Sequence, residues 1–91
     1  MFLGSKKHKK NNYKKTLRKF VKKNYFIKDS FSDSDSFFEN GIIDSTGVLE
    51  LVSFIEDKYD IQVEDEELIP ENLDSINNLS NFLKSKHSDA G

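Results

Sequence analysis

The chain has 91 residues, a net charge of −2 and no cysteine. A chain this short forms one small domain with a modest core, which argues against a deep active-site cleft. The lack of cysteine excludes disulfides, thiolate nucleophiles and cysteine-based metal sites. No apolar run reaches the roughly 18 residues needed for a transmembrane segment, and the start does not match an export signal, so we expect a cytoplasmic protein. We also expect a monomer.

The two ends of the chain have opposite charges. Residues 1–28 hold ten lysines and one arginine without an acid, giving +11, and residues 29–91 hold all 16 acids and three lysines, giving −13. A basic partner would bind the acidic part. The basic part could contact anionic lipid or nucleic acid, but it lacks interleaved exposed aromatic residues. A solvated tail and helix face is the favoured interpretation, and no nucleic-acid partner is predicted.

The first predicted elements are a tail, a helix and a long loop. Residues 1–12 are polar and lysine-rich without helical periodicity, which predicts a flexible basic tail. A helix is predicted from Tyr13 to about Asn24, because apolar residues recur there on one face. Residues 29–37 are rich in serine and aspartate, whose side chains compete for backbone hydrogen bonds, so a loop is predicted. Three phenylalanines are expected to pin this loop to the core: Phe31, Phe37 and Phe38.

Three further helices are predicted after this loop. The second runs from about Ser45 to Tyr59, since its apolar residues follow helical spacing. Its apolar stripe consists of Val48, Leu51, Val52, Ile55 and Tyr59. Pro70 favours the start of a short third helix, because its missing amide donor costs nothing there. Ser75 is expected to cap a last helix.

The predicted fold class is all-α. The helices would form a small helical bundle over residues 13–86, with a long loop between the first two helices. Residues 87–91 are expected to be a second flexible tail.

Ser45 is the residue that raises a question of chemistry. It follows Asp44 at the start of the second helix, after the apolar lead-in at residues 41–43. One of the pair is explained as a helix N-cap, worth about 1 kcal/mol. A nucleophilic serine needs a base, and His8 and His87 both fall in the predicted tails, so no catalytic residue is predicted. Any chemistry at Ser45 would therefore be carried out on it by another enzyme.

No metal site is predicted either. The two histidines lack ligand partners at useful spacing, and residues 33–44 resemble a calcium loop only in acidic density. Phe37 and Phe38 stand where that loop needs a ligand and a glycine.

The stretches "ENGIIDSTGVLELVSFIEDKYDI" and "PENLDSINNLSNFL" together resemble the acyl carrier protein family, with the resemblance spanning about residues 13–84. It implies a small four-helix bundle with a short third helix. It also implies that a phosphopantetheinyl transferase attaches 4′-phosphopantetheine to Ser45 and that Asp44 helps the transferase to recognise the site. The chain itself would not be an enzyme.

The resemblance also implies partner recognition through the acidic second helix. The expected recognition residues are Thr46, Glu50, Glu56 and Asp57. The family usually has leucine directly after the serine, so Thr46 and Gly47 predict a specialised set of partners. Those partners would be the transferase, an acyl- or aminoacyl-loading enzyme, and downstream synthases or transferases.

The expected function is that of a stand-alone carrier protein. It would hold an acyl group of fatty-acid or polyketide type as a thioester on the arm and present it to biosynthetic enzymes. Two alternatives remain open. One is an aminoacyl or peptidyl carrier of nonribosomal type, and the other is a non-covalent interaction module that uses the basic residues 6–28.

Overall fold

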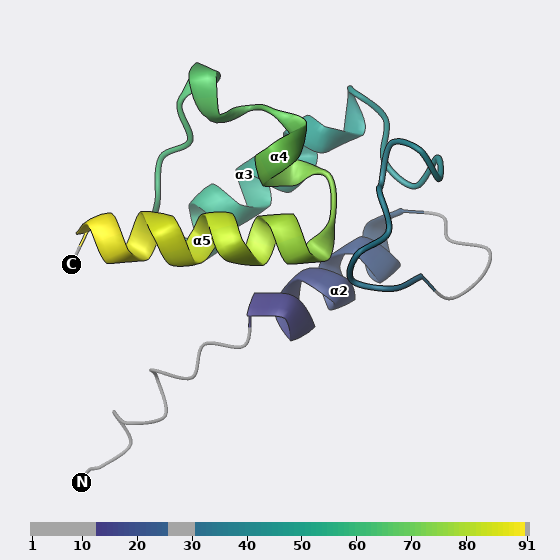
Figure 1. Cartoon of the computed structure of the whole chain (residues 1–91), viewed down its shortest axis with the longest axis horizontal. Coiled ribbons are helices and arrows are strands. Elements are labelled where there is room, and N and C mark those ends of the chain that lie inside the picture. Colours follow the sequence, from purple (N-terminus) through teal and green to yellow (C-terminus); the bar gives the residue numbers. More distant parts are fainter. Residues whose placement is uncertain (1–12, 26–30, 91) are drawn as a thin grey trace, which may run out of the picture.

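The computed structural model describes residues 13–25 and 31–90. Within them lie the helices α2 (Tyr13–Asn24), α3 (Gly47–Tyr59), α4 (Pro70–Leu73) and α5 (Ile76–Ala90), with a 3₁₀ turn, η1, at Asp65–Glu67. Figure 1 shows α5 lying across the molecule, with α4 beside its N-terminal half and α2 on its other side. This part of the chain contains no strand. The predicted all-α bundle, with a long first loop and a short third helix, is confirmed.

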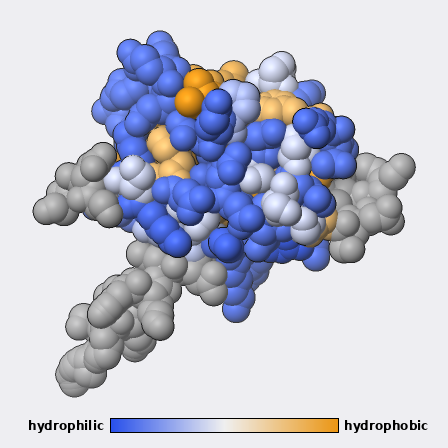
Figure 2. All heavy atoms as spheres, viewed as in Figure 1, coloured by the Kyte–Doolittle hydropathy of each residue, from blue (hydrophilic) through white to orange (hydrophobic). Residues whose placement is uncertain are grey.

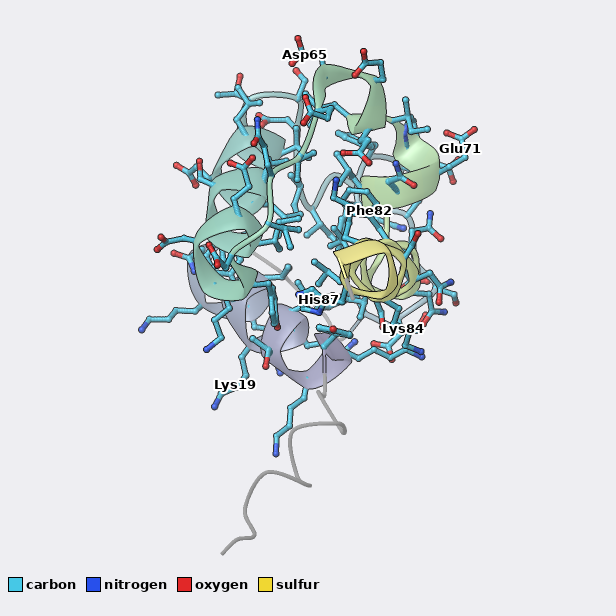
Figure 3. All side chains as sticks on the ribbon, turned by 90° about the vertical axis from the view of Figure 1, so that its left-hand side faces the viewer. Lys19, Asp65, Glu71, Phe82, Lys84 and His87 are labelled. Carbon is cyan, nitrogen blue, oxygen red and sulfur yellow. The ribbon has the colours of Figure 1, made fainter. Side chains whose placement is uncertain are left out.

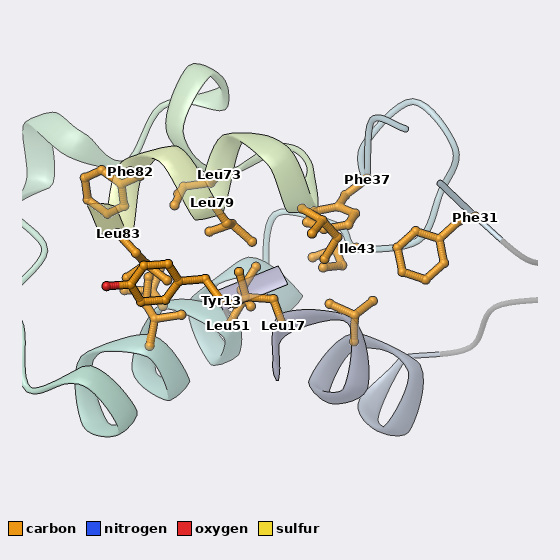
Figure 4. Packing of buried hydrophobic residues seen from close by; sticks show 14 residues of the cluster. Tyr13, Leu17, Phe31, Phe37, Ile43, Leu51, Leu73, Leu79, Phe82 and Leu83 are labelled. Carbon is orange, nitrogen blue, oxygen red and sulfur yellow. The ribbon is translucent and has the colours of Figure 1, made fainter. Parts of the chain in front are cut away.

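The core lies between α4 and α5 on one side and α2 and α3 on the other (Figure 4). Its helical members follow the predicted stripes, because residues three and four apart share one helix face. Phe37 and Ile43 lie at one end of the core, near Phe31, and Phe82 and Leu83 at the other. The buried apolar side chains are Tyr13, Leu17, Val21, Phe31, Phe37, Ile43, Leu51, Val52, Ile55, Leu73, Ile76, Leu79, Phe82 and Leu83.

The long loop before α3 is fastened to the junction between α4 and α5. The Phe37 amide donates to the Asp74 carbonyl at 2.7 Å, and the Phe38 amide donates to the Asp74 carboxylate at 3.0 Å. Phe31 and Phe37 are buried as predicted, whereas Phe38 is 39% exposed. The prediction for Phe38 was wrong, because adjacent residues in a turn point in different directions and Phe37 already occupies the core position.

The connector between α3 and α4 is held by carboxylates. The Glu56 carboxylate accepts a hydrogen bond from the Val63 amide at 2.9 Å, which fixes the chain after α3. Glu67 accepts from the Glu64 amide and forms an ion pair with Lys86 of α5, at 2.9 Å in each case. The Glu64 amide, and then the Lys86 ammonium, lower the pKa of Glu67 below its usual value.

Helix α5 is longer than the sequence predicts. Ser75 caps its start as expected, since its hydroxyl accepts from the Asn78 amide at 3.0 Å. At the other end the helix continues to Ala90, so residues 87–90 are helical. His87, expected in a tail, is hydrogen bonded to the Tyr13 hydroxyl and lies 6.0 Å from the Tyr59 ring between centroids. Residues 1–12, including His8, lie outside the described residues.

Charge is distributed unevenly over the bundle. In Figure 3, Lys19 extends outward from α2, whereas Asp65 of η1 and Glu71 of α4 project from the opposite end of the view. The face shown in Figure 2 is mostly hydrophilic, with apolar side chains in small separate groups.

None of the helices in the described ranges is both long and apolar enough to cross a membrane. The described residues also contain no group of three or more His, Asp or Glu side chains that could hold a metal ion.

Candidate attachment site at the start of α3

The apolar lead-in to α3 is anchored in the core and delivers the chain to the surface at Asp44. The amides of Ile42 and Ile43 both donate to the Phe37 carbonyl, at 2.8 and 3.4 Å, and Ile43 is buried. Gly41 turns the chain in the left-handed region at φ +68°, which glycine adopts without steric cost. Asp44, Ser45 and Thr46 follow as three exposed residues.

Asp44 is the residue that caps the helix. Its side-chain Oδ1 accepts from the Gly47 amide at 2.7 Å, and its carbonyl accepts from the Val48 amide at 3.0 Å. The Thr46 side chain makes no capping hydrogen bond. No described residue hydrogen-bonds to the Ser45 hydroxyl. Capping therefore explains Asp44 but does not explain Ser45.

A second Asp–Ser pair at a helix start provides an internal comparison. Ser75 follows Asp74 at the start of α5, yet it is only 5% exposed and its hydroxyl is used as the cap. The Asp74 carboxylate is bound to the loop through the Ser36 hydroxyl and the Phe38 amide. The two pairs look alike in sequence, but only Ser45 presents a hydroxyl to solvent.

The predicted recognition residues separate into two groups. Thr46, Glu50 and Asp57 are exposed and free to meet a partner. Glu56 is only partly exposed, and its carboxylate is engaged by the Val63 amide. Three of the four predicted recognition residues are therefore exposed, at the helix start or on α3. Glu56 instead stabilises the fold.

Leu49 is a surface residue that the sequence analysis did not single out. It is 56% exposed, the highest value among the exposed large apolar side chains of the described residues. It lies four residues after Ser45, which places the two on one side of the helix. The available signal was that Leu49 is apolar but falls outside the stripe that α3 turns to the core.

Tyr25 is the second residue that was missed. It directly follows α2, and its hydroxyl donates to the Gly47 carbonyl at 2.8 Å. Burial, with the nearby charges of Glu50 and Asp44, raises the pKa of Tyr25 to about 12. The phenol therefore stays protonated at neutral pH and remains a donor to the first turn of α3.

The site fits an attached phosphodiester. Such a group on the Ser45 oxygen would lie at the first turn of α3, where backbone amides and the helix dipole favour an anion. The amides of Ser45 and Thr46 make no hydrogen bond within the described part of the chain. An exposed hydroxyl beside two available donors suits a phosphate ester.

Comparison with known proteins identifies the family. The family model described as phosphopantetheine attachment site matches residues 17–83, a range that includes α3 and the turn before it. No curated protein matches the chain. Members of this family carry 4′-phosphopantetheine as a covalently attached prosthetic group, and such domains generally act as carriers that work with transferases and synthases. Because the match spans most of the chain, the protein belongs to the phosphopantetheine attachment site family and is a phosphopantetheine carrier protein.

Proposed function

We propose that Ser45 is the attachment residue and that the chain is a non-catalytic acyl carrier. The strongest support comes from the different roles of Asp44 and Ser45 at the start of α3. Asp44 supplies the cap through its 2.7 Å bond to the Gly47 amide, which leaves the neighbouring hydroxyl exposed. A serine kept out of the capping role, on a turn anchored to the core, suits a hydroxyl that another enzyme must reach.

The residues around Ser45 hold and present the group. The first-turn amides and the helix dipole stabilise the phosphodiester, and Asp44 adds a charge that the transferase recognises. The attached arm supplies a thiol, which forms the thioester with the cargo and which this cysteine-free chain lacks.

Partners dock on the exposed side of α3 beside Ser45. Leu49 offers an apolar contact, and Thr46, Glu50 and Asp57 add exposed polar and acidic side chains at the helix start and along α3. An apolar centre with a polar rim is the usual arrangement of a protein interface. Exposed ion pairs contribute only about 0–1 kcal/mol each, which suits a carrier that must bind and leave several enzymes in turn.

The cargo is an acyl group of fatty-acid or polyketide type, loaded by an acyl-loading enzyme and passed to synthases or transferases. The likeness of the chain to acyl carrier proteins supports this choice. An amino acid thioester is the alternative cargo.

Intact-mass measurement tests both parts of the proposal. Incubation with coenzyme A and a broad-specificity phosphopantetheinyl transferase should add one phosphopantetheinyl group to the wild type and none to Ser45→Ala. Ser75→Ala is the matched control, and it should be modified fully although it loses the cap of α5. Modification of Ser45→Ala, or none of the wild type, would overturn the attachment proposal. The mass of protein isolated from its native host then reports whether the cargo is acyl or aminoacyl.

A further inference from the structure

The start of α3 is held from outside the helix by Tyr25. The backbone amide of Tyr25 donates to the Val21 carbonyl at 3.0 Å, so Tyr25 extends the hydrogen-bonding pattern of α2 by one residue. Its ring lies edge-on to Phe20 at 6.0 Å between centroids. These contacts fix the direction of the side chain, and its hydroxyl reaches the Gly47 carbonyl at 2.8 Å, two residues after Ser45.

The glycine at position 47 is explained by close neighbouring atoms and not by an unusual backbone conformation. Among the described glycines only Gly41 has a positive φ. A Cβ atom at Gly47 would lie 3.2 Å from Cε1 of Tyr25 and 3.2 Å from Oδ1 of Asp44. Both distances are shorter than ordinary van der Waals contact. An alanine here would require the Tyr25 ring or the Asp44 carboxylate to shift by a few tenths of an ångström, so a glycine suits the close approach of the ring.

Both backbone polar groups of Gly47 are hydrogen bonded. Asp44 accepts from its amide at 2.7 Å, and Tyr25 donates to its carbonyl at 2.8 Å. Asp44 precedes α3, and Tyr25 directly follows α2 and is hydrogen bonded to it, so the first turn of α3 is tied to a second element. A turn held in this way restricts the orientations open to the exposed residues between Asp44 and Gly47.

We propose that Tyr25 is a positioning residue for the Ser45 hydroxyl and acts through Gly47. The inference rests on the proposed function of Ser45. Tyr25 does not touch the reacting oxygen, and it holds the turn so that the hydroxyl meets the transferase in one orientation. Loss of the Tyr25 hydroxyl should therefore affect the transfer step more than the docking of the carrier, which uses the outer side of α3.

Tyr25→Phe is the direct test, because it keeps the ring and removes only the donor. With coenzyme A and the transferase, kcat should fall by about 3- to 10-fold, the rate equivalent of one hydrogen bond, while KM for the carrier stays within about twofold. Tyr59→Phe is the matched control. It removes a hydroxyl at the opposite end of α3, where the Thr16 side chain hydrogen-bonds to Tyr59, and it should leave kcat unchanged.

Gly47→Ala tests the packing between the two residues. The added methyl group should lower kcat in the Tyr25 background and lower it less in a Tyr25→Leu background, where the ring edge is gone. The two effects should therefore be non-additive, as expected for residues in contact. Circular dichroism of each variant confirms that the comparison is made between folded proteins.

Amide NMR of the unmodified protein provides a readout that does not depend on the transferase. Tyr25→Phe should shift the resonances of residues 45–47, and Tyr59→Phe should not. Unchanged kcat and unchanged resonances in Tyr25→Phe, with normal modification of the wild type, would overturn the positioning role. Failure of the wild type to be modified would instead count against the proposed function, while the NMR comparison still tests the Tyr25 contact.

Discussion

At the scale of single residues, the adjacent side chains of Asp44 and Ser45 have different roles: Asp44 caps α3, and Ser45 is exposed. Both are good N-cap residues by type. The structure gives the cap to Asp44, whose Oδ1 accepts from the Gly47 amide, and leaves Ser45 exposed. At Asp74 and Ser75 the assignment is reversed, because there the serine caps and the aspartate binds the loop. The surroundings of each pair, and not its sequence, decide which residue is available for chemistry.

Substitutions at Asp44 should separate its cap from its charge. Asp44→Ala should lower the free energy of unfolding by about 1 kcal/mol, since it leaves the Gly47 amide without its acceptor. Asp44→Asn keeps an acceptor and should retain most of that stability, yet it should be modified more slowly if the transferase reads the negative charge. Urea denaturation and the initial rate of modification measure the two effects.

Ser45→Ala is the control for this series and should change the free energy of unfolding by less than about 0.5 kcal/mol. A loss as large as that of Asp44→Ala would mean that the serine is the cap, contrary to the structure.

At the scale of elements, α3 packs against the core with one face and exposes the other face to solvent. Leu51, Val52 and Ile55 are buried, whereas Glu50 and Asp57 are exposed. Glu56 lies between the two faces and fastens the connector at Val63. An acidic residue on this helix is therefore not by itself a docking residue.

Reversing charge on the exposed face should weaken docking and spare the fold. The double variant Glu50→Lys with Asp57→Lys should raise KM for the transferase at low salt, because attraction to a basic partner surface is lost. Its circular dichroism should match that of the wild type. Modification kinetics that do not change at low salt would show that the acidic face is only solvated.

Glu56→Ala is a useful contrast to this double variant. It should lower the melting temperature, since the Val63 amide loses its partner, and should have less effect on KM than the charge reversal.

The elements were largely predictable because their signals are local. The apolar stripe of α3, Pro70 at the first position of α4 and the Ser75 cap each depend on residues within one or two turns, and all three are confirmed. The end of α5 was not predicted, because residues 87–90 carry no apolar stripe and His87 is held by rings from α2 and α3.

The geometry of the candidate site was less predictable than the helices. The contact of Tyr25 with Gly47 joins residues 22 positions apart, and helical periodicity says nothing about such a pair. The role of Glu56 depends on the left-handed turn at Asp60, which brings Val63 back to the helix. The sequence could indicate Ser45 by its motif, but only tertiary packing shows what surrounds it.

At the scale of the whole molecule, the folded unit and the family match nearly coincide. The described core begins at Tyr13, and the family model begins to match at Leu17. We propose that residues 13–86 contain the carrier domain, although α5 itself runs to Ala90.

Deleting residues 1–11 tests this proposal. The deletion removes four lysines but no residue of the described core, so the melting temperature should change by less than a few degrees and Ser45 should still be modified. Removing this positive charge should not slow a transferase that docks on acidic α3. A large fall in melting temperature, or loss of modification, would place those residues within the working domain.

The position of Tyr25 gives the protein a natural probe of its own site. The chain has no tryptophan and three tyrosines. Tyr13 and Tyr59 lie together, 5.2 Å apart between ring centroids, and both contact His87, whereas Tyr25 lies against Gly47 at the start of α3. Biosynthetic labelling with fluorotyrosine would therefore place one fluorine nucleus at the attachment turn and two near the far end of α3, on Tyr59 and on the neighbouring Tyr13 of α2. The first would register arm attachment, loading and each docking event, and the other two would serve as internal references in the same spectrum.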